Sequence, residues 1–496
     1  MTTPTRTALA HLCDTAGSGI NTSGSAGSCV LTANVNGSGL DPAVVQVALG
    51  PHATQWLADA TKAPGLEVGA LIDIADPANP VAAAVVVPAV GVGPLAGYSF
   101  MVPQPTATPG GAPLVMIGET PVVSAVHVHG RYVVMVGSDT IFDDAWIGLA
   151  DNALLAVYAL AGRASEQAAH DCLTRKPGAV PQHVAPTVVT WPNDMSLPVP
   201  DAPELSEAFV SAAGYAARLL PAAIHDALVD FGDHGDPSGA LLLRDVPFGE
   251  VPPTPTSPTS SAAQSPASEF ALLVVARRLG QPIGYEPEHG GRLVQNILPT
   301  PQGSCRQVST SSAVTLAWHT EAAFHRYLPH YLLLACLRGD VAHAAATTFV
   351  SVDQLLPLLS LRARALLSEA RYQFCIDESY TGIHSSRRSE PRPILYGDPN
   401  APSLCYDELE VSACDPDAQA ALDELQDAVT ACHTSVVLEP GDLLVLDNTR
   451  TSHGRTPFAP RYDGTDRWLQ RTFVVPDLSA LGTDLADRIV TTRFLT

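Results

Sequence analysis

Two histidines and a glutamate in the C-terminal half of the chain are of the types that bind iron. His319 and Glu321 stand two residues apart at the end of an apolar, β-rich segment, 314–318. Residues two apart on an extended backbone point to the same side, so this imidazole and carboxylate can hold one cation. His453 follows a second such segment, 443–446. Two histidines and one carboxylate make the facial triad of non-haem Fe(II) oxygenases, which leaves three coordination positions open.

Two arginines follow His453 at a spacing that suits an anion clamp. Arg467 lies fourteen residues after His453, and Arg471 lies four residues further on. Positions four apart on a strand share a face, so both guanidiniums can face one pocket. A guanidinium binds a carboxylate through two parallel hydrogen bonds, as a dicarboxylate co-substrate requires. Such a clamp also explains how a chain of net charge −23 can hold an anion.

Each of these residues has an ordinary alternative. A single histidine at a strand end is more often hydrogen-bonded in a core or on a surface, and Arg467 and Arg471 are compatible with surface cations. Among sixteen histidines, chance His-x-acid matches are expected, and a second one occurs at His234–Asp236. His127 and His129 share a face of a predicted strand and could begin a metal site, although a polar strand face is the simpler interpretation. The triad hypothesis therefore rests on the combination, order and spacing of the residues.

Composition limits what the protein can bind. Of 496 residues, 46% are hydrophobic and 16% charged, which suffices for a large core and excludes disorder of the whole chain. The most apolar stretches are interrupted by Pro and Gly, so no membrane span is expected. The negative charge repels phosphate backbones and anionic lipid, so nucleic acid and membranes are unfavourable partners. Nine cysteines without a Cys-x-x-Cys pair, and no visible secretory signal, indicate reduced thiols and a cytoplasmic protein. The oligomeric state is not indicated.

A change in composition near residue 190 suggests two domains. Residues 1–190 are rich in Ala, Val, Gly and Thr, and we expect them to form a small α+β domain of unknown role, with a helix at about 143–161. Its strand-like runs are 29–35, 81–87, 122–128 and 132–136. Residues 191–496 form the second domain. The boundary falls in or near the Pro-punctuated stretch 175–201, where few contacts should cross.

The second domain must supply the elements that position the triad. Its pattern predicts helices over 203–231 and 268–279, with a Pro/Ser/Thr-rich flexible loop or linker at 251–267 between them. The predicted strands are 240–246, 293–298, 314–318, 331–337 and 443–446. A β-core flanked by helices favours a double-sheet jelly roll or a cupin-like barrel.

Motifs around these residues resemble those of the clavaminate synthase-like family, which includes asparagine oxygenase and the arginine β-hydroxylases of peptide-antibiotic pathways. They are His319–His325, Cys336–Asp340, Glu439–Asp442, His453–Phe458 and Asp466–Arg471, preceded by Gly280–Tyr285 and His289–Asn296. The resemblance runs from about residue 200 to the C-terminus. It implies an Fe(II)/2-oxoglutarate-dependent dioxygenase with a double-stranded β-helix, in which 251–267 is a loop within the domain.

Carried over position by position, the resemblance implies roles for individual residues. The iron ligands are expected to be His319, Glu321 and His453. Arg467 is expected to pair with the distal carboxylate of 2-oxoglutarate, with Arg471 beside the pocket. Thr347, or its neighbour Thr348, falls where a family threonine hydrogen-bonds this co-substrate. The third reactant is O₂.

The resemblance also indicates substrate-binding positions. Glu288 falls about where family members place a Glu or Gln on the substrate α-amine, and Asp407 falls where an acid meets the substrate side chain. Arginine hydroxylases tend to have Asp-x-Asp there, whereas this chain has Cys405–Asp407 with one acid, which argues against a guanidinium substrate. Before the His-x-Glu pair, the family's usual Asn and Gly-Ser are replaced by Thr310, Ser312 and Ala313. The polar segment 377–392 falls at the family's lid and is either a lid or a solvated loop.

The implied reaction is hydroxylation of an unactivated C–H bond, at C3, of a free amino acid or amino-acid derivative in specialised, antibiotic-type metabolism. It converts 2-oxoglutarate to succinate and CO₂, and a differently placed substrate gives desaturation or cyclisation instead. One alternative is a taurine-dioxygenase-like oxygenase acting on another small acid. Another is an idle binding protein whose N-terminal domain carries a separate binding or catalytic role. Glu288 and Asp407 favour an amine-bearing substrate, and three intact iron ligands argue against an idle protein.

Overall fold

The computed structural model describes most of the chain beyond residue 179. It covers residues 180–491 apart from 194, 261–264 and 377–387, together with 86–103, 111–128, 131–136, three short strands before them and a few single positions up to 155. The chain divides into two compact units: residues 1–177 with 360–365 and 398–400, and the rest of the chain from 178 onward. No helix among the described residues is long and apolar enough to cross a membrane.

The first unit contains an eight-stranded sheet in the order β1-β2-β3-β8-β7-β6-β4-β5. Its strands are β1 (Ile20–Thr22), β2 (Val30–Ala33), β3 (Val45–Leu49), β4 (Val86–Gly91), β5 (Ser99–Pro103), β6 (Ala112–Ile117), β7 (Thr120–Val128) and β8 (Arg131–Val136). The predicted runs correspond to β2, β7, β8 and, shifted towards the C-terminus, β4. The predicted helix at 143–161 and His129 fall almost entirely outside the described residues, so the α+β class and the role of this unit stay predictions.

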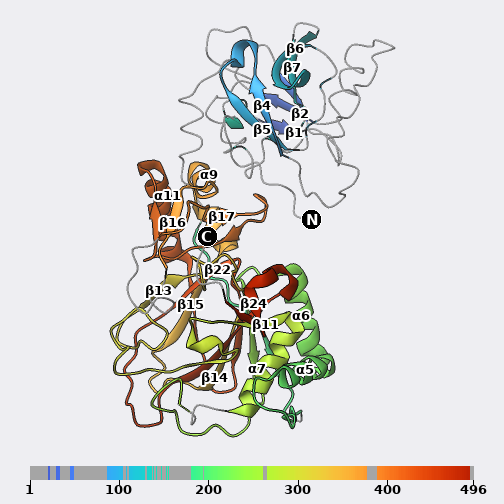
Figure 1. Cartoon of the computed structure of the whole chain (residues 1–496). Helices are drawn as coiled ribbons and strands as arrows, with labels where there is room; N and C mark the ends of the chain where they lie inside the picture. Colours follow the sequence, from blue (N-terminus) through green and yellow to red (C-terminus); the bar gives the residue numbers. More distant parts are fainter. Residues whose placement is uncertain are drawn as a thin grey trace. The chain divides into compact units, whose positions relative to one another are not determined.

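Two sheets build the second unit (Figure 1). The larger has the order β24-β25-β11-β23-β14-β21-β10-β9, with β12 also paired to β23, and the smaller has the order β13-β22-β15-β20. The larger sheet consists of β9 (Thr187–Thr190), β10 (Ala240–Arg244), β11 (Gln281–Tyr285), β12 (Gln295–Ile297), β14 (Tyr331–Arg338), β21 (Leu443–Asp447), β23 (Trp468–Val475), β24 (Leu485–Ala486) and β25 (Ile489–Val490). The smaller consists of β13 (Leu316–His319), β15 (Ala346–Ser351), β20 (Thr434–Val437) and β22 (Thr451–Arg455). Strands β21, β22 and β23 are buried along their whole length; of these, only β21 corresponds to a strand predicted from the sequence, 443–446.

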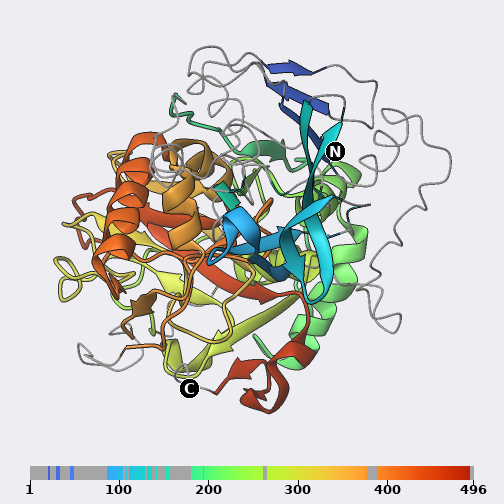
Figure 2. The ribbon, with the colours of Figure 1, turned by 90° about the horizontal axis from the view of Figure 1, so that it is seen from above.

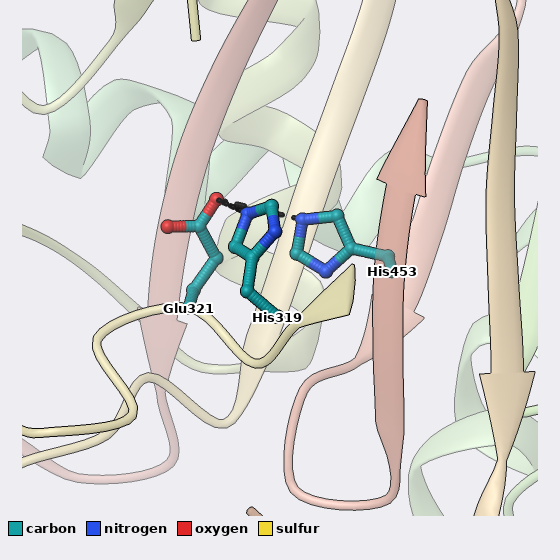
Figure 3. Close-up of side chains that lie close together, drawn as sticks. All are labelled: His319, Glu321 and His453. Carbon is teal, nitrogen blue, oxygen red and sulfur yellow. Dashed lines mark ion pairs between the residues drawn. The ribbon is translucent and has the colours of Figure 1, made fainter. Parts of the chain in front are cut away.

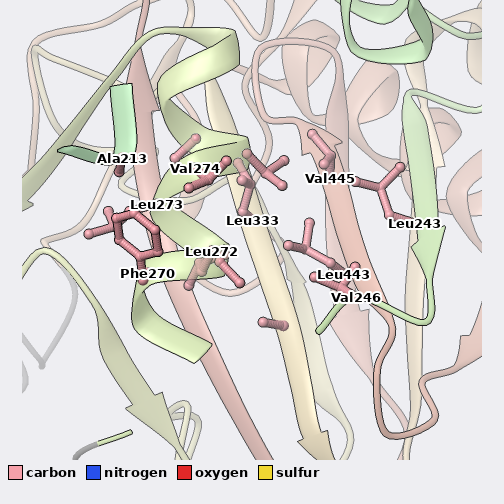
Figure 4. Close-up of a cluster of buried hydrophobic side chains, with 14 of the residues drawn as sticks. Ala213, Leu243, Val246, Phe270, Leu272, Leu273, Val274, Leu333, Leu443 and Val445 are labelled. Carbon is pink, nitrogen blue, oxygen red and sulfur yellow. The ribbon is translucent and has the colours of Figure 1, made fainter. Parts of the chain in front are cut away.

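The chain beyond residue 200 also contains helices. They are α5 (Glu207–Ala216), α6 (Ala222–His234), α7 (Pro266–Leu279), α8 (Val352–Leu355), α9 (Leu361–Leu367) and α11 (Pro416–Cys432). There are also two short strand pairs: β16 (Tyr372–Phe374) with β19 (Val411–Ala413), and β17 (Leu395–Tyr396) with β18 (Ser403–Leu404). Helix α7 contacts α5, β14 and β23, and its residues 268–276 are all buried (Figure 4). Two views show α11 on the far side of the strands from α5 and α6 (Figures 1 and 2).

The prediction of one continuous helix over 203–231 is wrong. Helix α5 passes into a 3-10 turn at Ala217–Leu219, and α6 begins only at Ala222, after Pro221. A proline disfavours a helical conformation of the preceding residue and has no backbone N–H to donate, so the helix is interrupted there. The predicted helix 268–279 is confirmed, beginning two residues earlier.

Residues 182–191 belong to the second unit although they lie in the Pro-rich stretch. The side chain of Gln354 donates to the carbonyl of Gln182 at 3.0 Å, and β9 pairs in parallel with β10. The backbone N–H of Trp191 donates to the carbonyl of Arg244 at 2.8 Å, and the Trp191 side chain is part of the hydrophobic core, 1% exposed. The contacts of residues 182–191 therefore lie within the second unit, which begins at residue 178 and not at 191.

The segment before α7 is a packed loop in its described part, 251–260. The backbone N–H of Thr254 donates to the carbonyl of Gly464 at 2.8 Å, and its hydroxyl donates to the carbonyl of Asp466 at 2.6 Å. Arg338 in turn donates to the Thr254 hydroxyl at 2.7 Å. These bonds place the segment within the second unit. This agrees with the family resemblance and contradicts the interpretation of the segment as a flexible linker.

Candidate active site

Two strands of the smaller sheet bring the predicted triad together (Figure 3). His319 ends β13 and is in register with His453 on β22, and the two rings lie 4.3 Å apart. The Oε1 atom of Glu321 lies 3.8 Å from Nε2 of His319 and 3.6 Å from Nε2 of His453. One potential ligand atom from each residue lies within 4.8 Å of the others, a spacing that a single cation can span. Their donor set, two imidazoles and one carboxylate, fits Fe(II) with open positions.

Glu321 reaches the site from a turn and not from the strand. Strand β13 ends at His319, and Ala322 has a left-handed φ of 55°, so the expectation that both ligands share a strand face is wrong. Asn448, which is fully buried, fixes the turn instead. Its Oδ1 accepts the Glu321 backbone N–H at 2.9 Å, and its Nδ2 donates to the carbonyls of Glu321 at 3.2 Å and Pro329 at 2.9 Å. Sequence reasoning gave Asn448 no role; the only signal was a polar residue directly after a buried strand.

Charges in the site prepare the triad for a metal ion. Burial lowers the pKa of His453 to about 4, with the charge of His319 acting in the same direction. Burial also acts to lower the pKa of His319, but the hydrogen bond and charge of Glu321 outweigh it and raise the pKa to about 9. Burial would raise the pKa of Glu321, but Arg471 and His319 hold it well below its ordinary value. Glu321 is thus a carboxylate and His453 a neutral imidazole, the forms that bind metal, whereas His319 releases a proton on binding.

Arg467 offers a site for a carboxylate in the same cavity. It lies just before β23, is 7% exposed and lines the cavity with the triad. No described residue accepts a hydrogen bond from its guanidinium. Burial lowers the pKa of Arg467, and Cys336 and Asp340 oppose that shift. Thr347 lines the same cavity from β15, whereas Thr348 does not, so the structure places the first of the two predicted threonines at the site. A buried guanidinium without an acceptor fits the distal carboxylate of 2-oxoglutarate.

Arg471 on β23 joins the metal site to Glu288. Its Nη1 donates to Oε1 of Glu321 at 2.8 Å, and its Nη2 donates to Oε1 of Glu288. Its Nε donates to Oε1 of Gln295 at 2.7 Å, which fixes the plane of the guanidinium. Glu288 is 7% exposed and lies beside Tyr285 at the end of β11. The structure therefore brings Arg471 and Glu288 together, while Gln295, on β12, is a site residue that sequence reasoning missed.

The predicted side-chain acid, Asp407, lines the cavity beside His319. The two residues form a backbone bridge, and one Asp407 oxygen, Oδ1, accepts the backbone N–H groups of Leu409 at 3.1 Å and Glu410 at 3.0 Å. Burial raises the pKa of Asp407 to about 6, partly opposed by the charge of His319. Glu410 lines the cavity as well, so this wall carries a second acid that the Asp-x-Asp comparison did not indicate.

One predicted substrate residue, Thr310, does not line the described cavity. The wall is formed there by Gln307, Val308 and Ser309, and the Thr310 carbonyl accepts the Thr300 N–H at 3.1 Å. The prediction that Thr310 binds substrate is therefore not supported by its position. Of the predicted lid at 377–392, residues 377–387 lie outside the described part of the chain.

Comparisons with known proteins identify the family of the chain. A model of the family described as taurine catabolism dioxygenase TauD, TfdA family matches residues 238–473. Clavaminate synthase 2 of Streptomyces clavuligerus is 37% identical over 274 residues, which is 54% of this chain and 84% of that protein. The chain belongs to the clavaminate synthase-like family. The L-asparagine oxygenase of Streptomyces coelicolor is 37% identical over 272 residues, 54% of this chain and 81% of the relative.

Solved structures of clavaminate synthase-like proteins share the fold. Asparagine oxygenase in complex with Fe(II), 2S,3S-3-hydroxyasparagine and succinate has a TM-score of 0.56 and 34% identity, and the match covers 62% of this chain and 99% of that one. The non-heme iron oxygenase OrfP in complex with Fe and alpha-ketoglutaric acid has a TM-score of 0.51 and 34% identity over 58% and 90% of the two chains. The core is a double-stranded β-helix, and the protein is an Fe(II)/2-oxoglutarate-dependent dioxygenase that uses O₂.

Proposed function

We propose that this dioxygenase hydroxylates an unactivated C–H bond, at C3, of a free amino acid or amino-acid derivative in specialised metabolism. The observation that carries the proposal is the buried pair of Arg471 and Glu288 in the cavity of the triad. A guanidinium and a carboxylate side by side are complementary to the α-carboxylate and α-ammonium groups of one amino acid. Because Arg471 also contacts the metal ligand Glu321, a head group bound there would lie beside the metal site, which favours attack at a carbon near the head group, such as C3.

The co-substrate has its own residues in the same cavity. His319, Glu321 and His453 hold iron, Arg467 binds the distal carboxylate of 2-oxoglutarate, and Thr347 donates a hydrogen bond to it. When bound, iron, 2-oxoglutarate and O₂ supply the oxidising chemistry that places a hydroxyl group on the C–H bond, with release of succinate and CO₂. The roles of the chain are to bind both organic molecules in one orientation and to exclude water.

The acids that line the cavity beside His319 indicate how the substrate side chain is bound. Asp407 and Glu410 place two acids there, which suits a side chain that donates hydrogen bonds or carries positive charge. Relatives support both the head group and the position of attack. The L-lysine 3-hydroxylase of Catenulispora acidiphila is 35% identical over 295 residues, and an L-ornithine/L-arginine 3-hydroxylase from that organism is 29% identical over 298 residues.

The test is an assay of the full chain with Fe(II), 2-oxoglutarate and air. The panel holds asparagine, lysine, ornithine and arginine, and the same compounds without the α-amine or the α-carboxylate. Succinate and a product 16 mass units heavier are expected with an intact amino acid only. A loss of two mass units reveals desaturation or cyclisation. Turnover of an amine-free acid at equal rate assigns the protein to the alternative, an oxygenase of small acids.

Residues 1–177 supply none of the residues named in these roles, and we propose a separate binding or structural role for them. We also propose a cytoplasmic location. The six cysteines in the described part of the chain are free thiols, of which four are buried, as expected in a reducing compartment.

A further inference from the structure

A second buried arginine lines the cavity close to the proposed co-substrate clamp. Arg455 ends β22, two residues after His453, and is in register with Thr347 on β15. Residues two apart on a strand face the same side, and Arg455 is 5% exposed and lines the cavity. Neither the expected metal ligands nor the expected co-substrate contacts assign it a role.

Arg455 donates only to neutral acceptors in the described chain. Its Nη2 donates to the hydroxyl of Ser311 at 2.8 Å and to the carbonyl of Val314 at 3.2 Å. Its Nη1 donates to the carbonyl of Thr456 at 3.1 Å, with Ser312 more distant at 3.5 Å. No carboxylate of the described residues forms an ion pair with it. A buried cation without a counter-ion costs free energy, which is recovered when an anion enters the cavity.

Arg455 and Arg467 share one aromatic neighbour. The Arg455 Cζ lies 5.0 Å from the centre of the Phe458 ring, and the Arg467 Cζ lies 6.0 Å from it. The acid whose charge reaches Arg467 is Asp340, and its carboxylate already accepts three backbone N–H groups, from residues 342, 344 and 345. The acid nearest in its effect on Arg467 is therefore engaged by backbone groups, and Arg455 has no acid as a partner among the described residues.

We propose that Arg455 is a second cation of the co-substrate site, which attracts a dianionic ligand through its charge while Arg467 makes the contact. The inference rests on the proposed role of Arg467. Charge–charge interactions over this range are strong where water is largely excluded, and they act most on the ligand with the larger charge. Arg455 thereby favours 2-oxoglutarate over 2-oxo acids that have a single carboxylate.

The test compares binding of 2-oxoglutarate and 2-oxopentanoate to the full-length, Mn(II)-loaded protein by calorimetry. Arg455→Gln removes the charge and keeps hydrogen-bonding groups, whereas Arg455→Lys keeps the charge. Ser311→Asp supplies Arg455 with a counter-ion and leaves the arginine in place, and Ser311→Asn is its neutral control of equal size. The Ser311 pair provides the answer if Arg455→Gln does not fold.

Arg455→Gln and Ser311→Asp are expected to weaken 2-oxoglutarate binding about 10-fold while changing 2-oxopentanoate binding about 2-fold or less. Arg455→Lys and Ser311→Asn are expected to retain the preference for the dicarboxylate. The proposal is overturned if a variant loses equal affinity for both ligands, or if the Gln and Lys variants lose equal affinity for 2-oxoglutarate. Arg455 then has only a structural role, through its hydrogen bonds to residues 311–314. Arg467→Ala distinguishes the role of Arg467 from that of Arg455. If this variant binds 2-oxoglutarate as the parent does, the proposed role of Arg467 is wrong. If it binds 2-oxoglutarate more weakly while Ser311→Asp binds it normally, only the role of Arg455 is refuted.

Discussion

Arg471 donates a hydrogen bond of 2.8 Å to Oε1 of Glu321, the carboxylate oxygen that faces both histidines of the triad. The cation that we assign to the substrate carboxylate therefore touches a metal ligand directly. This contact joins substrate binding to the metal site through one side chain. A substrate carboxylate bound by Arg471, as we propose, would therefore lie next to the metal ligand Glu321.

Removal of any triad residue is expected to abolish catalysis without unfolding the protein. His319→Ala, Glu321→Ala and His453→Ala each leave two protein ligands, too few to hold Fe(II) with three open positions. The measurements are succinate release, bound iron and the circular dichroism spectrum. His234→Ala, in the exposed second His-x-acid motif, is the matched control and should behave as the parent. Turnover near the parent rate in a triad variant, at ordinary iron concentrations, removes that residue from the ligand set.

Asn448 is expected to control iron affinity although it does not contact the metal. Asn448→Ala loses three hydrogen bonds that fix the Glu321 turn and the neighbouring Pro329 carbonyl. Loss of a residue that orients a ligand typically costs about 10–100-fold in metal affinity. The measurement is a Fe(II) or Co(II) titration of the folded variant under anaerobic conditions. Unchanged metal affinity contradicts the positioning role. Asn448→Asp, which keeps the acceptor for the Glu321 N–H, should lose less than the alanine variant if that bond dominates.

Arg467 and Arg471 are expected to affect different ligands. Arg467→Ala removes a charge-assisted pair from a buried site, so the apparent requirement for 2-oxoglutarate should rise by roughly 10–100-fold, with a much smaller change in the requirement for iron. Arg471→Ala should instead raise the KM for the amino acid. Steady-state titrations of each component in both variants separate these effects. If the co-substrate requirement of Arg467→Ala stays normal, the clamp must be assigned to another arginine.

The residues proposed as ligands could be selected from residue type, local spacing and the family resemblance. The triad, Arg467 and Thr347 all lie at the cavity as expected. What positions them was not predictable, because it depends on contacts between segments far apart in the chain. Asn448 bonds to a residue 127 positions away, and Arg471 bonds to Glu288 across 183 positions. The error at Pro221 was different in kind: the proline stood in the sequence, and the helical periodicity on both sides obscured the break.

Glu269 is expected to make stability fall as pH rises towards neutrality. It is fully buried in α7, and burial raises its pKa to about 7, partly opposed by Arg292. The folded state then binds a proton more tightly than the unfolded chain, so this contribution to stability is complete below about pH 4.5 and is lost as pH rises through about 7. Its size is of the order of 3 kcal/mol.

Glu269→Gln stays neutral and keeps a hydrogen-bond acceptor for Arg292, so it should be more stable than the parent at pH 8 and of similar stability at pH 5. Chemical unfolding at the two pH values measures the difference. Glu250→Gln, a change at an exposed position, is the control and should leave the pH dependence as it is. A parent whose free energy of unfolding is the same at both pH values, or a Gln variant that is destabilised at pH 8, contradicts the prediction.

The oxygenase unit is expected to fold and function without the first 177 residues, provided that the segment 182–191 is kept. A fragment of residues 178–496 retains β9 and the core position of Trp191, whereas a fragment that begins at Asp201 loses both. Loss of one buried tryptophan side chain alone costs about 3–5 kcal/mol, a large share of the stability of a domain. The longer fragment should therefore keep iron-dependent turnover of 2-oxoglutarate with the amino-acid substrate at the rate of the full chain, and the shorter one should melt at a clearly lower temperature or be insoluble.

Equal melting temperatures of the two fragments contradict the structural role given to 182–191. A longer fragment that is folded and loaded with iron but inert towards the substrate shows that residues 1–177 contribute to the active site, and the modular interpretation is then wrong.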